Sequence, residues 1–419
     1  MHRAMKGACA GILVLVYAAC VDSLGPGNQA NDRISIVNDP STLAARVTYS
    51  NTPIVIDDTG VGYPSAPAPF ASAAIAGSPA APAAFSLTLV AEVAPPTVGG
   101  QPLQATSVNI TGTRAIVSYN MRGNPYAGGI DVYDFSSSVI LKSEALFQKT
   151  DVSSAITSGS SVFLAEATGD TGFAAPAVLE KMRIVGTSLV LTGNTRKGLT
   201  SFTATSVTTS GSRAYVTSGN TGKLFRIDTA SFAIVDSISL PDVRWVDVNS
   251  GKVVVVQGGS PSGRIRVYND ANLAPLGNYT FTGADIAQSK STVQLYGGKA
   301  FIAAGRGGVQ ILSASTGRFD GTVARPNPVS LGLGDSVVVT NAVAVSDDLM
   351  FISNGEAGVY VARGSQSFLT SSAEANQTIT ILGKLRFANL QSVNHVAYVP
   401  PYLVIAAGLG GIKLVKVTF

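Results

Sequence analysis

Short runs of alternating apolar and polar residues recur from residue 85 to the end of the chain, separated by Gly-containing turns. Alternation of this kind, bounded by turn residues, predicts β-strands and few helices. One phrase recurs seven times. An apolar anchor lies in a first alternating strand, a tight turn follows, and a second strand begins six positions after the anchor. The anchors and the residues six positions later are Val108 and Arg114, Ala155 and Ser161, Val207 and Arg213, Val246 and Lys252, Val293 and Lys299, Val343 and Leu349, and Val396 and Tyr402.

The spacing of these anchors predicts the fold. Successive anchors are 47, 52, 39, 47, 50 and 53 residues apart, which suits one four-stranded propeller blade per copy. After the second strand of each copy come a Gly-containing turn, a third strand and, in most copies, a fourth outer strand. The sequence therefore predicts an all-β protein, a seven-bladed β-propeller over residues 85–419.

The seventh copy ends after its third strand, GIKLVKV, and lacks an outer strand. The run FSLTLVAEV, Phe85 to Val93, alternates correctly and directly precedes the first copy, so we assign it as the missing strand. The ring would then be closed by pairing of this N-terminal outer strand with the C-terminal strands. Such pairing satisfies backbone groups that an open edge would expose.

Several of these strands match a known repeat pattern. The phrases AYVTSGNTG, LVIAAGLGG and IDVYDFS resemble the bacterial YVTN- and LVIVD-type β-propeller repeats, and Ala214 to Gly219 and Gly129 to Ser136 carry the likeness best. The resemblance covers roughly residues 85–419 and implies a propeller, often in an extracytoplasmic location. It does not imply one activity.

The N-terminus has the features of an export signal. Arg3 and Lys6 precede an apolar run from Ala10 to Ala19, which is too short to span a bilayer and suits a secretory signal over residues 1–19. The run ends YAAC and resembles a bacterial lipoprotein signal, which implies lipidation of Cys20 and an envelope location, in the outer membrane or at the cell surface. The alternative is plain secretion or a periplasmic protein.

Residues 20–84 are expected to form a tether that holds the propeller away from the membrane. Its second half, residues 63–84, is rich in Ala, Pro and Ser and cannot bury much apolar surface. Before it, the segments RISIVNDP and TPIVIDDTG have strand-like alternation. They form either a short hairpin or a segment docked on the main domain, and the sequence does not decide between them.

Charge and residue types exclude several classes of function. Removing Arg3 and Lys6 from the 29 basic residues leaves 27 against 25 acidic residues, so no strong field favours nucleic acid. Apart from the signal, His395 is the one histidine and Cys20 the one cysteine of the chain. We therefore assign no catalytic residue, metal site or cofactor. The Gly-rich turn at residues 305–308 lies between two predicted strands, which favours a hairpin turn over a phosphate loop.

The connections around one mouth of the channel are the expected binding surface. Mixed charge with Tyr and Trp on a rigid scaffold suits a protein or glycan partner. We predict a non-enzymatic protein attached to the membrane only by its N-terminal lipid. The alternatives are a propeller-type lyase or hydrolase using His395 with Arg244 or Arg306, and a structural subunit of an envelope complex. The candidate partner-binding residues are Arg122, Tyr126, Asp170, Arg244, Trp245, Arg306, Glu356 and His395.

Overall fold

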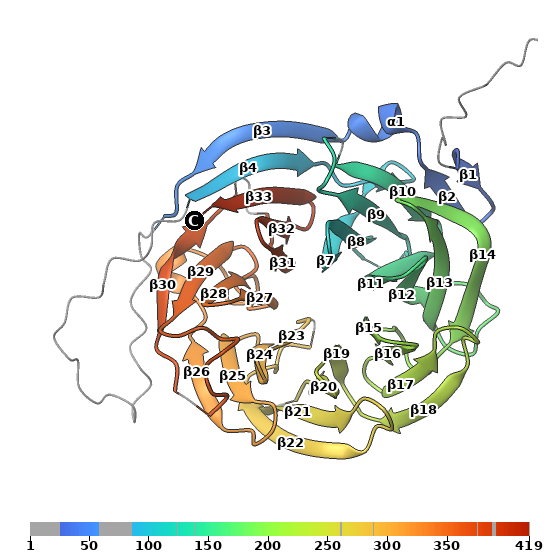
Figure 1. Cartoon of the computed structure of the whole chain (residues 1–419). Helices are drawn as coiled ribbons and strands as arrows, with labels where there is room; N and C mark the ends of the chain where they lie inside the picture. Colours follow the sequence, from blue (N-terminus) through green and yellow to red (C-terminus); the bar gives the residue numbers. More distant parts are fainter. Residues whose placement is uncertain are drawn as a thin grey trace, which may run out of the picture.

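Seven antiparallel sheets surround a central channel in the computed structural model (Figure 1). The structure describes residues 26–57 and 86–418, except 124, 139, 260, 261, 288, 375 and 388–390. The predicted signal peptide, Cys20 and the whole Ala/Pro/Ser-rich stretch, residues 63–84, lie outside the described residues. No helix among the residues described is long and apolar enough to cross a membrane.

Blades 1 to 3 follow the predicted order, with each first strand at the channel and each fourth strand at the rim. Blade 1 contains β7 (Gln104–Thr111), β8 (Arg114–Asn120), β9 (Gly128–Asp134) and β10 (Leu141–Phe147). Blade 2 contains β11 (Thr150–Ser158), β12 (Ser161–Thr168), β13 (Ala177–Val185) and β14 (Ser188–Gly198). Blade 3 contains β15 (Ser206–Ser210), β16 (Arg213–Thr217), β17 (Lys223–Asp228) and β18 (Ile234–Ser239).

Blades 4 to 6 have the same arrangement. Blade 4 contains β19 (Val243–Asn249), β20 (Lys252–Gln257), β21 (Ser262–Asn269) and β22 (Pro275–Thr282). Blade 5 contains β23 (Val293–Tyr296), β24 (Lys299–Ala303), β25 (Val309–Ser313) and β26 (Phe319–Val323). Blade 6 contains β27 (Ala342–Ser346), β28 (Leu349–Ser353), β29 (Val359–Gly364) and β30 (Ile379–Leu385). In all six blades the second strand begins at the residue predicted from the anchor.

Blade 7 confirms the predicted ring closure. Its strands β31 (His395–Val399), β32 (Tyr402–Ala406) and β33 (Ile412–Thr418) are completed by β4 (Ser86–Val93) from the N-terminal side. The pairing of β4 with β33 is antiparallel and runs from Val93 opposite Ile412 to Ser86 opposite Thr418. The ring is thus closed by strands from opposite ends of the sequence.

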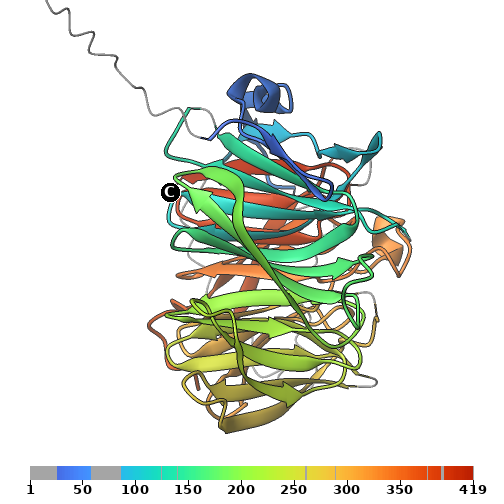
Figure 2. The same cartoon turned by 90° about the vertical axis from the view of Figure 1, so that its right-hand side faces the viewer.

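The described part of the expected tether, residues 26–57, lies along the rim, and we call it the rim strap. It contains β1 (Gln29–Ala30), β2 (Ile34–Val37), α1 (Pro40–Ala44) and β3 (Val47–Ile54). Strand β2 pairs with β10 of blade 1, and β3 pairs with β4 of blade 7, so the two segments dock on different blades. Figure 2 shows the disc from the side, with α1 at its rim.

The core is divided among the seven contacts between neighbouring blades. Each of the seven buried apolar clusters joins residues of two adjacent blades, as Val132 of blade 1 and Leu164 of blade 2 do in one of them. The remaining elements, two short strands β5 (Thr97–Val98) and β6 (Gln101–Pro102) and the 3-10 helix η1 (Val329–Leu331), lie in connections. The blades therefore form one rigid ring around the channel.

Candidate functional site in the central channel

The two faces of the ring differ in what they present. The loop face carries the connections from second to third strands and from each fourth strand to the next blade, whereas the turn face carries the tight turns from first to second strands. The Gly-rich connections of the loop face are hairpin turns, as predicted. Gly308, for example, has φ +68, and a Cβ there would lie 2.1 Å from the Val323 carbonyl oxygen, so only glycine fits.

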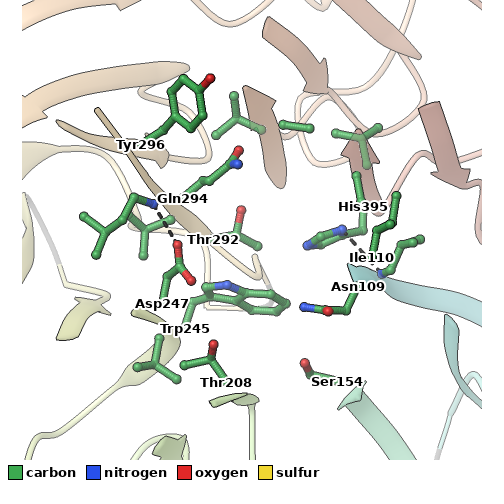
Figure 3. A pocket seen from close by; sticks show the side chains of 18 of the residues that line it. Asn109, Ile110, Ser154, Thr208, Trp245, Asp247, Thr292, Gln294, Tyr296 and His395 are labelled. Carbon is green, nitrogen blue, oxygen red and sulfur yellow. Dashed lines mark hydrogen bonds between the residues drawn. The ribbon is translucent and has the colours of Figure 1, made fainter. Parts of the chain in front are cut away.

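A pocket of about 320 Å³ lies in the channel, lined by inner strands of all seven blades (Figure 3). Side chains alternate along a strand, so every second residue of an inner strand faces the channel. Strand β19 contributes Trp245, Asp247 and Asn249, and β23 with the residue before it contributes Thr292, Gln294 and Tyr296. The other walls include Asn109, Ser154, Thr208, Ala344, His395, Ala397 and Tyr398.

Trp245 and His395 narrow the channel toward its loop-face end. They extend from β19 and β31 toward each other, with 5.3 Å between their ring centroids (Figure 3). Lys290 lies beyond them: its Nζ is 5.7 Å from the Trp245 ring centroid and donates a 3.1 Å hydrogen bond to the Ser153 carbonyl oxygen of blade 2. The pocket therefore ends at Trp245 and opens toward the turn face, where Asn249 is exposed.

A β-bulge at Arg244 precedes Trp245 on β19. The pairing of β19 with β20 shifts register between Val243 and Trp245, which leaves Arg244 unpaired. Bulges redirect side chains, and here Arg244 turns to Asp242, which accepts from Nε at 3.0 Å and from Nη2 at 2.8 Å. Arg244 also donates to the Ile286 carbonyl oxygen at 2.8 Å, so it holds the connection that carries Lys290.

Several channel side chains link the inner strands of neighbouring blades. Asp247 accepts from the Leu295 backbone N–H at 2.7 Å, and Gln294 accepts from the Val345 N–H at 2.7 Å. Tyr296 accepts from the Asp347 N–H at 3.0 Å. Innermost strands have unpaired edge groups, and these side chains satisfy some of them. Part of the polar lining is therefore structural.

Burial sets the ionisation of three groups near the pocket. Burial and the charge of Lys290 lower the pKa of His395 to about 3. Burial raises the pKa of Asp247 to about 6, against the effect of its two backbone hydrogen bonds, and lowers the pKa of Lys290 to about 8. At neutral pH the lining therefore carries an ionised Asp247 and a neutral His395.

This ionisation state can be checked directly, because His395 is the one histidine outside the predicted signal. We expect its imidazole NMR resonances to stay unchanged between pH 5 and 8, since the pKa is near 3. A titration midpoint near the unperturbed value of about 6.5 would contradict this burial. A denatured sample, in which the imidazole is solvated, is the control.

All eight residues predicted to bind a partner lie on the loop face or at the channel entrance, in six blades. Among them, the rings of Trp245 and His395 meet across the channel. Several of the others are engaged in ion pairs: Arg306 contacts Asp285 and Asp335 at 2.9 Å each, and Asp170 contacts Arg196 at 2.6 Å. Arg122 is exposed in the β8–β9 connection near half-buried Tyr126, and Glu356 is half-buried in the β28–β29 turn.

Sequence reasoning missed Asp247, Lys290 and the polar side chains of the pocket wall. One signal would have found part of the wall, because the residue directly after each anchor faces the channel in several blades. These residues are Asn109, Thr208, Asp247, Gln294, Ala344 and Ala397. Lys290 lies in the long connection between β22 and β23, which is outside the repeated phrase, so the repeat does not predict its position. No group of three or more His, Cys, Asp or Glu side chains in the described part of the chain is arranged to hold a metal ion.

The fold and the site define a seven-bladed β-propeller with a rim strap and a pocket in its channel. No family model and no curated protein sequence matches the chain. It is similar to one chain of a crystal structure of the mitotic checkpoint complex, with a TM-score of 0.51 and 13% identity over 71% of this chain and 85% of that chain. A likeness at this identity shows the fold alone.

Two further solved structures resemble this chain with lower TM-scores. One is BamB from Moraxella catarrhalis, with a TM-score of 0.48 and 10% identity over 78% of this chain and 86% of that chain. The other is the computationally designed Ika8 protein, with a TM-score of 0.46 and 12% identity over 79% of this chain and 93% of that chain. Likeness this distant supports no conclusion about function.

Proposed function

We propose that this protein is a non-enzymatic binding protein of the bacterial cell envelope, which takes one end of a protein or glycan partner into its channel pocket. The observation that carries the proposal is Trp245, a flat aromatic surface at the end of a pocket with polar walls. Concave sites with an aromatic surface and a few polar groups are typical of ligand recognition. Membership of the YVTN- and LVIVD-type repeat proteins remains part of the proposal.

The ionisation of His395 argues against a role for it as a catalytic base. General acid–base catalysis works best with a pKa near the operating pH, and His395 has a pKa near 3. Its Nδ1 accepts a long, 3.5 Å hydrogen bond from the Val108 backbone N–H, and its neighbour across the channel is an indole. His395 therefore suits a pocket wall better than a base.

Attachment through a lipid on Cys20 is the second part of the proposal. Pro26, the first described residue, follows Cys20 by six positions, and a chain of that length spans at most about 20 Å. A lipid on Cys20 would therefore hold the rim of the propeller close to the membrane. Mass measurement of the mature N-terminus tests this, since a diacyl or triacyl mass on Cys20 supports it and an unmodified terminus contradicts it.

Filling the pocket should abolish partner binding. Ala397 is a small residue of the pocket wall on β31, and Ala397→Trp would place an indole in a volume of about 320 Å³. We expect at least a tenfold loss of binding to glycan arrays and to partners captured from envelope extract. Leu409→Trp is the matched control, because Leu409 belongs to the same blade but is 49% exposed in a loop-face turn. Binding that survives Ala397→Trp but fails with Leu409→Trp would instead place the site on the loop face.

A further inference from the structure

The pocket contains one carboxylate, and that carboxylate has no cationic partner among the described residues. The two oxygens of Asp247 accept from the Val248 and Leu295 backbone N–H groups at 2.8 and 2.7 Å, and no ion pair reaches them within the described chain. The two cations nearest in sequence are engaged elsewhere, since Arg244 pairs with Asp242 and Lys252 donates to Ser315. Lys290 donates to the Ser153 carbonyl oxygen of blade 2. A desolvated carboxylate without a counter-ion is costly, and a bound cation would remove that cost.

The surroundings of Asp247 restrict what kind of cation fits. Trp245 precedes it by two residues on the same strand, so the indole and the carboxylate face the channel one above the other. Aromatic faces attract ammonium groups and pack against flat apolar surfaces. Thr208 of the neighbouring blade 3 and Asn109 of blade 1, on the far side of the channel, offer hydrogen-bonding groups, and Ala344 of blade 6 is a small residue that leaves room. An aliphatic amine alone would leave the amide and hydroxyl groups unused.

The size of the pocket sets the length of the ligand. A volume of about 320 Å³ lies at the lower end of the range for small-molecule sites, about 300–1,000 Å³. It suits one sugar ring. A chain of sugars would have to continue out through the turn face.

We propose that the pocket binds one hexosamine residue with a free, protonated amino group. The amino group pairs with the Asp247 carboxylate, one face of the sugar ring packs on Trp245, and the hydroxyls bond to Asn109 and Thr208. This inference rests on the proposed function, since it names the ligand of the same pocket. A lysine side chain has the same charged group but lacks the hydroxyls that the walls would bind.

Calorimetric titration of the full chain with four probes tests the inference: glucosamine, N-acetylglucosamine, glucose and Nα-acetyl-lysine amide. We expect glucosamine to bind at least tenfold more tightly than each of the others. Asp247→Asn should reduce glucosamine affinity at least tenfold and reduce it by a larger factor than glucose affinity. Asparagine keeps one oxygen to accept the Leu295 N–H, and unchanged thermal unfolding would show that the variant is folded.

The pH dependence of the unaltered protein gives a second readout that needs no variant. Binding requires ionised Asp247, so glucosamine affinity should fall as the pH is lowered through about 6, the pKa of this group. It should fall again at high pH, where the amine of the sugar loses its proton. A flat profile between pH 5 and 7 would overturn the pairing with Asp247.

The remaining outcomes separate this inference from the proposed function. Equal binding of glucose and glucosamine, or tighter binding of the lysine derivative, would overturn the hexosamine assignment. If no sugar binds while Ala397→Trp still abolishes partner binding, the hexosamine assignment fails and the pocket remains the partner site. If Ala397→Trp leaves partner binding unchanged, the proposed function itself fails.

Discussion

Arg46→Ala should lower the free energy of unfolding by about 3–5 kcal/mol, because it leaves buried carboxylates without their counter-ion. Arg46 lies between α1 and β3 of the rim strap. Its Nη1 and Nη2 contact the Asp131 carboxylate at 2.9 and 2.7 Å, and Nη1 also contacts Glu144. The Asp131 side chain is fully buried, and the hydroxyls of Tyr119 and Tyr133 donate to it as well. Chemical denaturation monitored by circular dichroism measures the loss.

Arg306→Ala is the matched control for that substitution. Arg306 also contacts two carboxylates, Asp285 and Asp335, but its side chain is 45% exposed, against 16% for Arg46. Exposed pairs of this kind contribute at most about 1 kcal/mol. Equal losses for the two variants would show that Arg46 does not stabilise buried charge.

The loss caused by Arg46→Ala should grow as the pH rises. Burial and the neighbouring Asp131 raise the pKa of Glu144 from 4.5 to about 7, and Arg46 opposes that shift. A group whose pKa is raised on folding stabilises the native state below its unfolded pKa and loses that effect as the pH rises through its folded pKa. Without Arg46 the folded pKa of Glu144 rises further, so the part of the deficit that comes from Glu144 should begin to grow as the pH rises above about 7.

The strands were predictable because a local signal repeats. The residue six positions after each anchor opens the second strand in all copies, as Lys252 does for β20 and Tyr402 for β32. Each blade contains its own turns and its own alternation, so no long-range information was needed to place the strands. The closure by β4 was also predictable, since a ring with a missing strand leaves one consistent partner.

The docking of the rim strap was not predictable from the sequence. Strand β2 alternates between buried and half-buried residues. Such alternation predicts a strand but does not predict which other strand pairs with it. Strand β3 is mostly exposed or half-buried, so its pattern is weak. Arg46 meets Asp131 across 85 positions of sequence, and no local pattern records such a contact.

The candidate site was predictable only in part, for a similar reason. Trp245 and His395 were recognised by residue type and placed near the channel mouth. Alternation with Asp247 places Trp245 on the channel side of β19, whereas the bulge at Arg244 interrupts the alternation before it. A bulge adds one residue without changing the repeat phrase, so the sequence does not reveal that Arg244 is unpaired. Asp247 was overlooked, although its position directly after the Val246 anchor is one that faces the channel in several blades.

Ending the chain at Gly411 should abolish cooperative unfolding altogether, which is the largest effect we expect. The deletion removes β33, which pairs with β32 on one side and with β4 on the other, so blade 7 would be left with two strands at the channel. The ring would lose its closure, and β4 with the attached β3 would lose its pairing with β33. Thermal unfolding monitored by calorimetry should show no single transition.

A synthetic peptide of residues 412–419 provides the control for this truncation, since it restores the missing strand without the covalent link. Added in excess, it should return a cooperative transition whose midpoint rises with peptide concentration, because a ligand that binds only the folded state stabilises it by mass action. A peptide in which Leu414 and Val417, both buried in the native blade, are replaced by Asp should have no effect. A truncated chain that melts like the full protein without any peptide would show that the pairing of β4 with β33 does not hold the ring closed.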